Sequence, residues 1–260
     1  MRVRLSPFAF ALTLALAALA AAAPAPVSTE AEIAAVLAAP DRNAADRERD
    51  ARDRPAQTLG LLGLTRGMRV LDAFTGGGYY AEIAARVVGP SGSVRAHSNR
   101  AYLSFAGKDL EQRLAARPIA NLQRLDREIE ELGLANEIDA ALLVLAYHDA
   151  YWKPKEGEWT VTRDPLMAAL FRALRPGGRL LVIDHAAAAG SGSAAAQELH
   201  RIDEAFARAD FERAGFRFVA SSDALRNPAD DRSKSVFEDA IRGKTDRFVT
   251  VLEKPAAEGS

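Results

Sequence analysis

The most informative stretch of this chain is Met68-Arg69-Val70-Leu71-Asp72-Ala73-Phe74-Thr75-Gly76-Gly77-Gly78-Tyr79-Tyr80. An apolar run ends in an acid, turns through glycines and opens into a predicted helix over 81–88. Glycines let the backbone approach a ligand without a Cβ in the way, and the start of a helix offers free N–H groups. The stretch therefore predicts the strand–loop–helix unit by which an α/β sheet holds a nucleotide-like ligand.

The rest of the chain predicts further strands alternating with helices, as in a doubly wound parallel sheet. We expect strands over 68–72, 92–97, 121–125, 138–145, 179–184, 216–221 and 247–254. We expect helices over 30–37, 55–62, 81–88, 101–116, 165–174 and 193–214. The last two strands have no helix between them, so the last strand is predicted to return antiparallel beside the sixth. The predicted fold is α/β, with a single Rossmann-like, doubly wound, seven-stranded sheet.

The N-terminus, Met1–Ala23, has the pattern of a secretory signal peptide. Two arginines precede an apolar run, and Ala18-Leu19-Ala20 fits a cleavage site. The alternative is an uncleaved anchor, although the apolar run is short for a membrane span. We expect the protein to be periplasmic or secreted, without a stable membrane anchor once the signal is cleaved.

Two further segments follow the signal. Residues 24–54 form an N-terminal helical and charged extension, in which the run Asp41–Arg54 is predicted to be a solvated helix or loop. Residues 55–256 form the main domain.

Composition excludes several classes of function. The chain has no cysteine, which rules out disulfides, thiolate metal sites and a cysteine nucleophile. Without the two signal arginines, 32 of the 34 basic residues remain against 35 acidic ones, a net charge near −3. That charge gives no electrostatic case for nucleic acid or an anionic membrane. The expected partner is a small-molecule substrate, and the oligomeric state stays open.

These elements and motifs resemble the class I S-adenosylmethionine-dependent methyltransferase family over about residues 55–255. Four regions carry the resemblance: 70–78, 121–132, 138–149 and 174–184. More narrowly, the chain resembles exported bacterial proteins described as predicted methyltransferases, through residues 76–79, 147–149, 200–203 and 242–248. The resemblance implies a seven-stranded sheet of class I methyltransferase type, S-adenosylmethionine as the methyl donor, and methyl transfer to an acceptor.

The resemblance also implies which residues hold the cofactor: Asp72, Thr75, Gly76, Gly77, Gly78, Tyr79, Asn99 and Glu128. Two positions depart from the family pattern. Phe74 stands where the first glycine usually lies, and the second strand ends in Ala96-His97-Ser98-Asn99-Arg100, without the acid that binds the ribose hydroxyls. Asn99 can accept one hydrogen bond and donate another, more weakly than a carboxylate binds. A nicotinamide site is disfavoured, because that acid and a third glycine after Gly78 at the expected spacing are both missing.

The candidate catalytic residues are Tyr147, His148 and Asp149, at the carboxyl end of the fourth strand. Open α/β sheets bind ligands at this edge. His148 is the expected general base, because imidazole titrates near neutral pH, and Asp149 orients it or contacts substrate. The alternative is a polar strand terminus whose side chains bond only to the protein.

Two more histidines are predicted near this edge. His185 ends the fifth strand, and His200 lies on the predicted helix 193–214, on one face with Asp203. A histidine–carboxylate metal site is chemically permitted, but the ligands lack tight spacing, so we expect no metal and a hydrogen-bonded network instead. Three functions therefore stay open: a methyltransferase, a methyltransferase fold that binds a ligand or partner without chemistry, and a metal-dependent hydrolase built on His148, His185 and His200.

Overall fold

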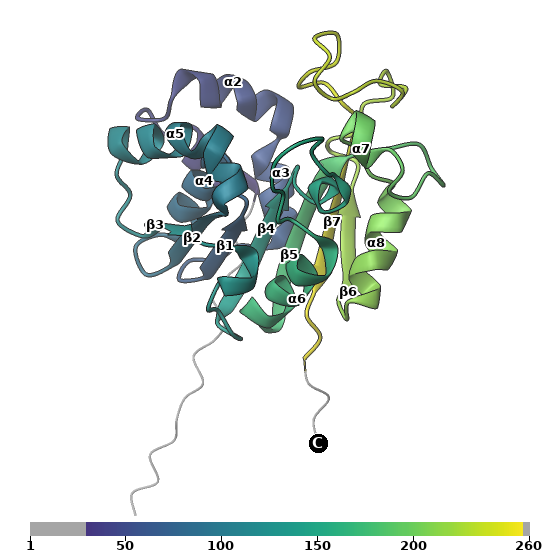
Figure 1. Cartoon of the computed structure of the whole chain (residues 1–260). Helices are drawn as coiled ribbons and strands as arrows, with labels where there is room; N and C mark the ends of the chain where they lie inside the picture. Colours follow the sequence, from purple (N-terminus) through teal and green to yellow (C-terminus); the bar gives the residue numbers. More distant parts are fainter. Residues whose placement is uncertain (1–29, 257–260) are drawn as a thin grey trace, which may run out of the picture.

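The computed structural model describes residues 30–256 (Figure 1). Their strands form one sheet in the order β3-β2-β1-β4-β5-β7-β6. The strands are β1 (Arg69–Ala73), β2 (Ser93–Ser98), β3 (Leu122–Asp126), β4 (Ile138–Val144), β5 (Leu174–His185), β6 (Arg217–Ser222) and β7 (Arg247–Glu253). The first five run parallel, and β7 lies antiparallel between β5 and β6. The predicted doubly wound sheet with an antiparallel last strand is confirmed.

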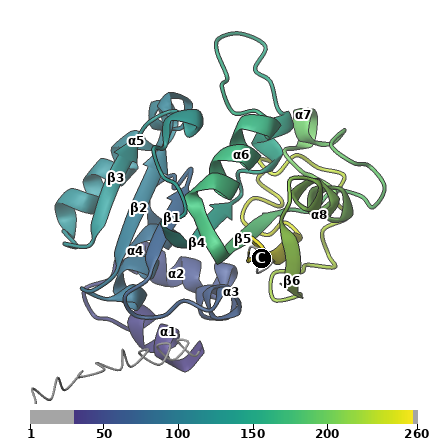
Figure 2. The same cartoon turned by 90° about the horizontal axis from the view of Figure 1, so that it is seen from below.

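Helices cover both faces of the sheet (Figures 1 and 2). They are α1 (Glu30–Leu37), α2 (Ala44–Asp53), α3 (Pro55–Leu62), α4 (Tyr79–Val88), α5 (Arg100–Ala116), α6 (Arg163–Ala173), α7 (Ala196–Leu199) and α8 (Glu204–Arg213), with 3-10 turns η1 (Ile129–Glu131) and η2 (His148–Tyr151). Adjacent residues of β5 show the two-sided burial: Leu180 packs in the cluster with α6 and α8, and Leu181 in the cluster with α3 and α4. Both faces are therefore apolar, as in other parallel sheets covered by helices.

The carboxyl ends of the parallel strands meet at one edge of the sheet. The loops after β1, β2, β4 and β5 all start there, which places the glycine turn beside the tip of β4. The long segment 223–246, before β7, rises over the same end of the molecule (Figure 1). Among residues 30–256, no helix has both the length and the apolar character needed to cross a bilayer.

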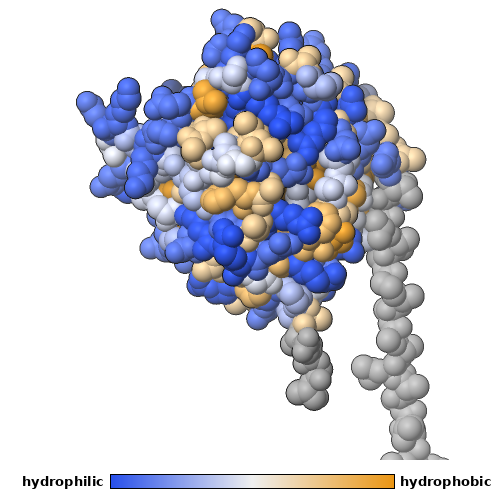
Figure 3. All heavy atoms as spheres, turned by 90° about the vertical axis from the view of Figure 1, so that its right-hand side faces the viewer, coloured by the Kyte–Doolittle hydropathy of each residue, from blue (hydrophilic) through white to orange (hydrophobic). Residues whose placement is uncertain are grey.

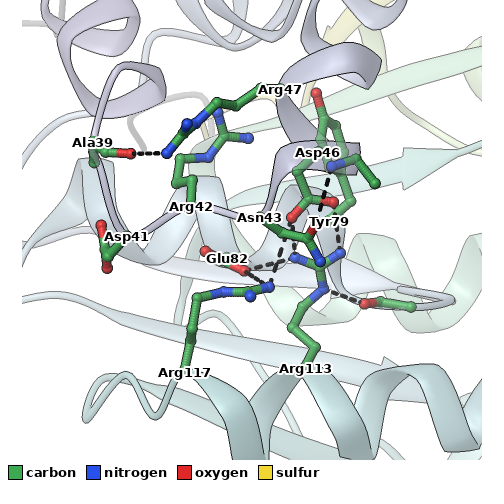
Figure 4. Close-up of polar contacts among 12 residues, drawn as sticks. Ala39, Asp41, Arg42, Asn43, Asp46, Arg47, Tyr79, Glu82, Arg113 and Arg117 are labelled. Carbon is green, nitrogen blue, oxygen red and sulfur yellow. Dashed lines mark hydrogen bonds and ion pairs between the residues drawn. The ribbon is translucent and has the colours of Figure 1, made fainter.

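The charged run before Pro55 is helical, which is one of the two predicted forms, but only one side of it is solvated. It forms α2, and Asp46 and Asp53 on this helix are only 6% and 1% exposed. Arg113 of α5 binds both Asp46 and Glu82 (Figure 4). Buried carboxylates are tolerated because each meets a guanidinium. These ion pairs fasten the extension to the main domain, and the predicted signal peptide lies outside the described residues.

The prediction of a single helix over 193–214 is wrong. Helix α7 ends at Leu199, and the next residue, His200, has a φ of 52° in the left-handed region. The chain then extends so that Ile202 pairs with Ala186 beside the end of β5, and Asp203 caps the new helix α8. The apolar periodicity of 199–206 was compatible with a helix, but pairing with β5 satisfied the backbone instead. His200 and Asp203 therefore do not share a helix face.

Candidate functional site

The glycine turn follows β1 and leads into α4. Asp72 is 2% exposed, and the hydroxyl of Thr75 donates to its carboxylate at 2.5 Å. Burial raises the pKa of Asp72 to about 7, against the opposing effects of the Thr75 hydrogen bond and the nearby charge of Arg49. A Cβ on Gly76 would meet no heavy atom within 4 Å, whereas one on Gly78 would lie 2.8 Å from Leu110 of α5. Gly76 therefore faces open space, and Gly78 is required by helix packing.

Phe74 takes the place of a glycine and keeps the backbone conformation that glycine favours. Its φ is 55°, its N–H donates to Nδ1 of His97 at 3.4 Å, and its ring stacks on Tyr102 with centroids 4.7 Å apart. His97 is fully buried, and its Nε2 lies 3.0 Å from the carbonyl of Arg127. Burial lowers the pKa of His97 to about 4, so the ring is neutral and anchors the turn.

The residues expected to hold the ribose and adenine do lie together, but they hold a side chain of the protein. Asn99 is fully buried; its carbonyl caps α5, and its amide donates to the Thr160 hydroxyl at 3.1 Å. The same hydroxyl donates to Glu128 at 2.7 Å. Asn99 and Glu128 are thus both hydrogen-bonded to one hydroxyl group. This group belongs to the segment that connects η2 to α6.

The tip of β4 carries the second half of the site. Asp184 of β5 accepts from the backbone N–H of His148 at 2.8 Å and lies 2.7 Å from its Nδ1. Nε2 of His148 lies 3.3 Å from Oδ1 of Asp149, and Nδ1 of His200 lies 3.8 Å from the same oxygen. The hydroxyl of Tyr102 donates to the other carboxylate oxygen of Asp149. Two carboxylates therefore flank one buried imidazole.

This arrangement sets the protonation of His148. Burial lowers the pKa of the imidazole, but the charges of Asp184 and Asp149 outweigh it and raise the pKa to about 9. Burial opposes ionisation of Asp149, yet His148 and the hydrogen bonds to Asp149 hold its pKa below the usual value. Without a further ligand, His148 is protonated at neutral pH and carries a positive charge. Its role as general base stays a prediction, and the raised pKa means that the imidazole must first lose a proton to act as one.

Several other predicted residues point away from the site. Tyr147 is fully buried, and its hydroxyl donates to Asp210 of α8. Tyr79 donates to Asp50 of α2 at 2.7 Å. Arg201, which entered the sequence predictions only through the stretch 200–203 of the narrower resemblance, is fully buried against Asp230, with nitrogen–oxygen distances of 2.9 and 3.1 Å. These residues hold helices and loops together and do not face a ligand.

Sequence reasoning missed the residues that join the two halves. Tyr102 of α5 stacks on Phe74 and donates to Asp149, so it connects the glycine turn with the tip of β4. Asp184 orients His148, although in the sequence it is only the last acid of an apolar strand. One signal was available for Tyr102: it is the third residue of α5, the helix that follows the predicted ribose-binding turn.

The comparisons with known proteins agree with this organisation. Residues 46–124 match the family described as protein-L-isoaspartate(D-aspartate) O-methyltransferase (PCMT). The ubiquinone/menaquinone biosynthesis C-methyltransferase UbiE of Pseudomonas entomophila is 32% identical over 129 residues, 49% of this chain and 45% of that protein. The Haemophilus ducreyi protein of the same name is 25% identical over 128 residues, 49% of this chain and 45% of its own. The chain thus spans about half the length of the curated relatives it matches.

Solved structures share the fold at low identity. A SAM-dependent methyltransferase of Aquifex aeolicus superposes with a TM-score of 0.57 at 19% identity, covering 87% of this chain and 99% of that one. The [4+2]-cyclase SpnF superposes with a TM-score of 0.53 at 17% identity, covering 90% and 88%. The sheet order and the glycine turn define a class I methyltransferase fold. The family match spans the glycine turn, and with the UbiE matches it makes about half of the chain similar to the S-adenosylmethionine-dependent methyltransferase family.

The residues fit the cofactor of that family. Gly76 opens onto free space beside a buried carboxylate, and Asn99 and Glu128 already hold a hydroxyl, the group that a ribose presents. The Thr160 hydroxyl is thus a stand-in for a sugar hydroxyl. The fit carries one condition: the segment that bears Thr160 must give way when the nucleoside enters.

Proposed function

We propose that this chain transfers a methyl group from S-adenosylmethionine to a small-molecule acceptor held at the tip of β4. The bound cofactor supplies an electrophilic methyl group on a sulfonium. Asp72, Gly76, Asn99 and Glu128 hold it, and His148 with Asp149 holds the acceptor. The observation that carries the proposal is the Tyr102 bridge, because it fixes the acceptor side directly beside the cofactor side.

Positioning is the main contribution that this site makes to the rate. His148 and Asp149 orient an acceptor oxygen or carbon acid, and holding it in line with the sulfonium supplies most of the rate. The acceptor loses its proton to neutral His148 or to water during or after the transfer.

The rim of the site favours an aromatic acceptor. Trp152 lies with its ring centroid 4.8 Å from Trp159 and 5.4 Å from His200, and Phe237 lies 4.7 Å from His200. Phe237 is 54% exposed and belongs to the long segment before β7. Planar apolar molecules stack on such rings. The UbiE relatives are named for C-methylation in quinone biosynthesis, which agrees with an aromatic acceptor.

The test begins with titration calorimetry of S-adenosylmethionine and S-adenosylhomocysteine into the protein. We expect micromolar dissociation constants that Asp72→Ala abolishes. Methyl-labelled cofactor with a panel of phenols and quinols then reports transfer as extractable label. His148→Ala should abolish transfer and leave cofactor affinity within about three-fold. Loss of cofactor binding in folded His148→Ala protein would contradict the division of the site into two halves.

A second function has one specific observation in its favour. Thr160 and Phe74 occupy the cofactor side, with Phe74 only 3% exposed. A fold that binds a ligand without chemistry would keep this filled state. Absence of cofactor binding up to millimolar concentration in folded protein would select this function over methyl transfer.

The N-terminal sequence supports export as a further part of the proposal. Residues 1–23 carry the charge and apolar pattern of a signal peptide. A fusion to alkaline phosphatase, which is active only outside the cytoplasm, should be active, and removal of residues 1–23 should abolish that activity. Equal activity with and without those residues would contradict export.

A further inference from the structure

We propose that His148, Asp149 and His200 bind a divalent transition-metal ion. One ligand atom from each side chain, two imidazole nitrogens and a carboxylate oxygen, lies within 4.8 Å of the others. The three come from η2 and from the end of α7, segments about fifty residues apart that only the sheet brings together.

The separations suit ligands around an ion better than hydrogen bonds. Nε2 of His148 and Nδ1 of His200 lie 3.3 and 3.8 Å from the same oxygen of Asp149. Both distances exceed an ordinary N–H···O bond, and 3.8 Å lies outside the range. Ligands about 2.0–2.1 Å from a tetrahedral zinc ion are about 3.4 Å from one another. The cluster therefore needs only small adjustments to close around one ion.

A second observation is that outer groups orient two of the ligands. Asp184 is hydrogen-bonded to Nδ1 of His148, and this contact directs Nε2 toward the centre of the cluster. The hydroxyl of Tyr102 donates to one carboxylate oxygen of Asp149, so the other oxygen can bind the ion. Metal-bound histidines are commonly fixed by a carboxylate in this way.

The backbone of His200 is a third observation. Its φ of 52° is a conformation that costs free energy for a residue with a side chain, and such residues concentrate at functional sites. The imidazole that this backbone carries packs between Trp152 and Phe237 and is 17% exposed. The third ligand is therefore the one that a solvent-borne ion reaches first.

Charge and ligand type define the class of ion. Two imidazoles and one carboxylate suit zinc or a neighbouring divalent ion of the first transition row, and Mg²⁺ and Ca²⁺ prefer all-oxygen sites. With Asp184 beside the site, a divalent cation balances two buried carboxylates. Three protein ligands leave at least one position open for water or an acceptor oxygen. This last role rests on the proposed methyl transfer, whereas the binding site itself does not.

The test uses tag-free full-length protein, stripped with a chelator and titrated with Co²⁺ alone and with Zn²⁺ alone. We expect one ion per chain, visible Co²⁺ absorption bands typical of nitrogen and oxygen ligands, and displacement of Co²⁺ by Zn²⁺. His200→Ala should weaken Zn²⁺ binding by at least about 100-fold, and Asp184→Asn by about 10- to 100-fold. Circular dichroism verifies that each variant is folded, and Asp149→Asn replaces any variant that is not.

A histidine in the same region serves as the matched control. His185 lies with its ring 5.9 Å from that of His148, but its Nδ1 lies 2.7 Å from the hydroxyl of Thr245. His185→Asn should bind Zn²⁺ within about three-fold of the parent protein. Binding that survives His200→Ala, or no binding below about 100 µM in the parent protein, would overturn the site. Metal binding without cofactor binding would keep this inference and reject the proposed methyl transfer.

Discussion

Asp72→Asn is the substitution that most directly tests the energetics of the glycine turn. Asp72 is 2% exposed, and burial raises the pKa of its carboxyl from an ordinary 3.8 to about 7. In the unfolded chain the carboxyl ionises near its ordinary pKa. At pH values between the two pKa values, the folded state therefore binds one more proton than the unfolded state does. The free energy of unfolding therefore falls as pH rises from about 4 to 7 and changes little from this group above 7.

The size of this effect follows from the difference between the two pKa values. It corresponds to about 4 kcal/mol at most, since one pH unit is worth about 1.36 kcal/mol. Asparagine carries no charge at any pH, so its variant lacks this dependence. The asparagine side chain keeps a carbonyl oxygen that can accept from the Thr75 hydroxyl. Its NH₂ group replaces a carboxylate oxygen, which lowers the free energy of unfolding by about 1 kcal/mol. As pH rises from 4.5 to 8, the free energy of unfolding of the variant should increase by about 2–4 kcal/mol relative to that of the parent.

Urea unfolding, followed by far-ultraviolet circular dichroism at several pH values, measures the difference. Asp223→Asn is the matched control, because the Asp223 side chain is 93% exposed and should show no such pH-dependent gain. A constant difference between Asp72→Asn and the parent across this pH range would refute the argument that the buried charge of Asp72 destabilises the folded protein. The same variant should also lose S-adenosylhomocysteine binding.

Two further substitutions separate ligand effects from stability effects. Thr160→Val removes the hydroxyl that occupies the sugar side, so calorimetry should find S-adenosylhomocysteine bound about 3- to 30-fold more tightly, in line with the loss of one or two hydrogen bonds; unchanged affinity would mean that Thr160 does not compete. Arg201→Met leaves the buried Asp230 without its guanidinium, with only the backbone N–H groups of Arg232 and Asp246 donating to it, so urea unfolding should show a loss of about 3–5 kcal/mol. Combining Arg201→Met with Asp230→Asn, which removes the charge and keeps an acceptor oxygen, should recover part of this loss. Equal stability of the two variants would argue against a buried ion pair.

The face formed by β6 and α8 has a mixed surface. Figure 3 shows small apolar patches there, separated by hydrophilic residues. The aromatic rim at the tip of β4 combines apolar rings with buried charges, which is the usual composition of a small-molecule site.

The amino-acid sequence alone determined the sheet and its connections. Apolar runs bounded by glycine and proline, such as those that became β1, β4 and β5, predict buried parallel strands because only a two-sided core accepts them. The acid and glycines of 72–78 likewise predicted the ligand-binding turn, since backbone conformation is a local property.

Only the tertiary structure decided which polar side chains meet. The run before Pro55 looked solvated because its charges have their partners on α4, α5 and β7, far away in sequence. The periodicity of 193–214 suggested one helix, because the pairing of Ile202 with the end of β5 is invisible locally. The charge on His148 depends on Asp184, thirty-six residues later. Electrostatic energies depend on distance in space, so these properties followed only once the sheet had placed the loops together.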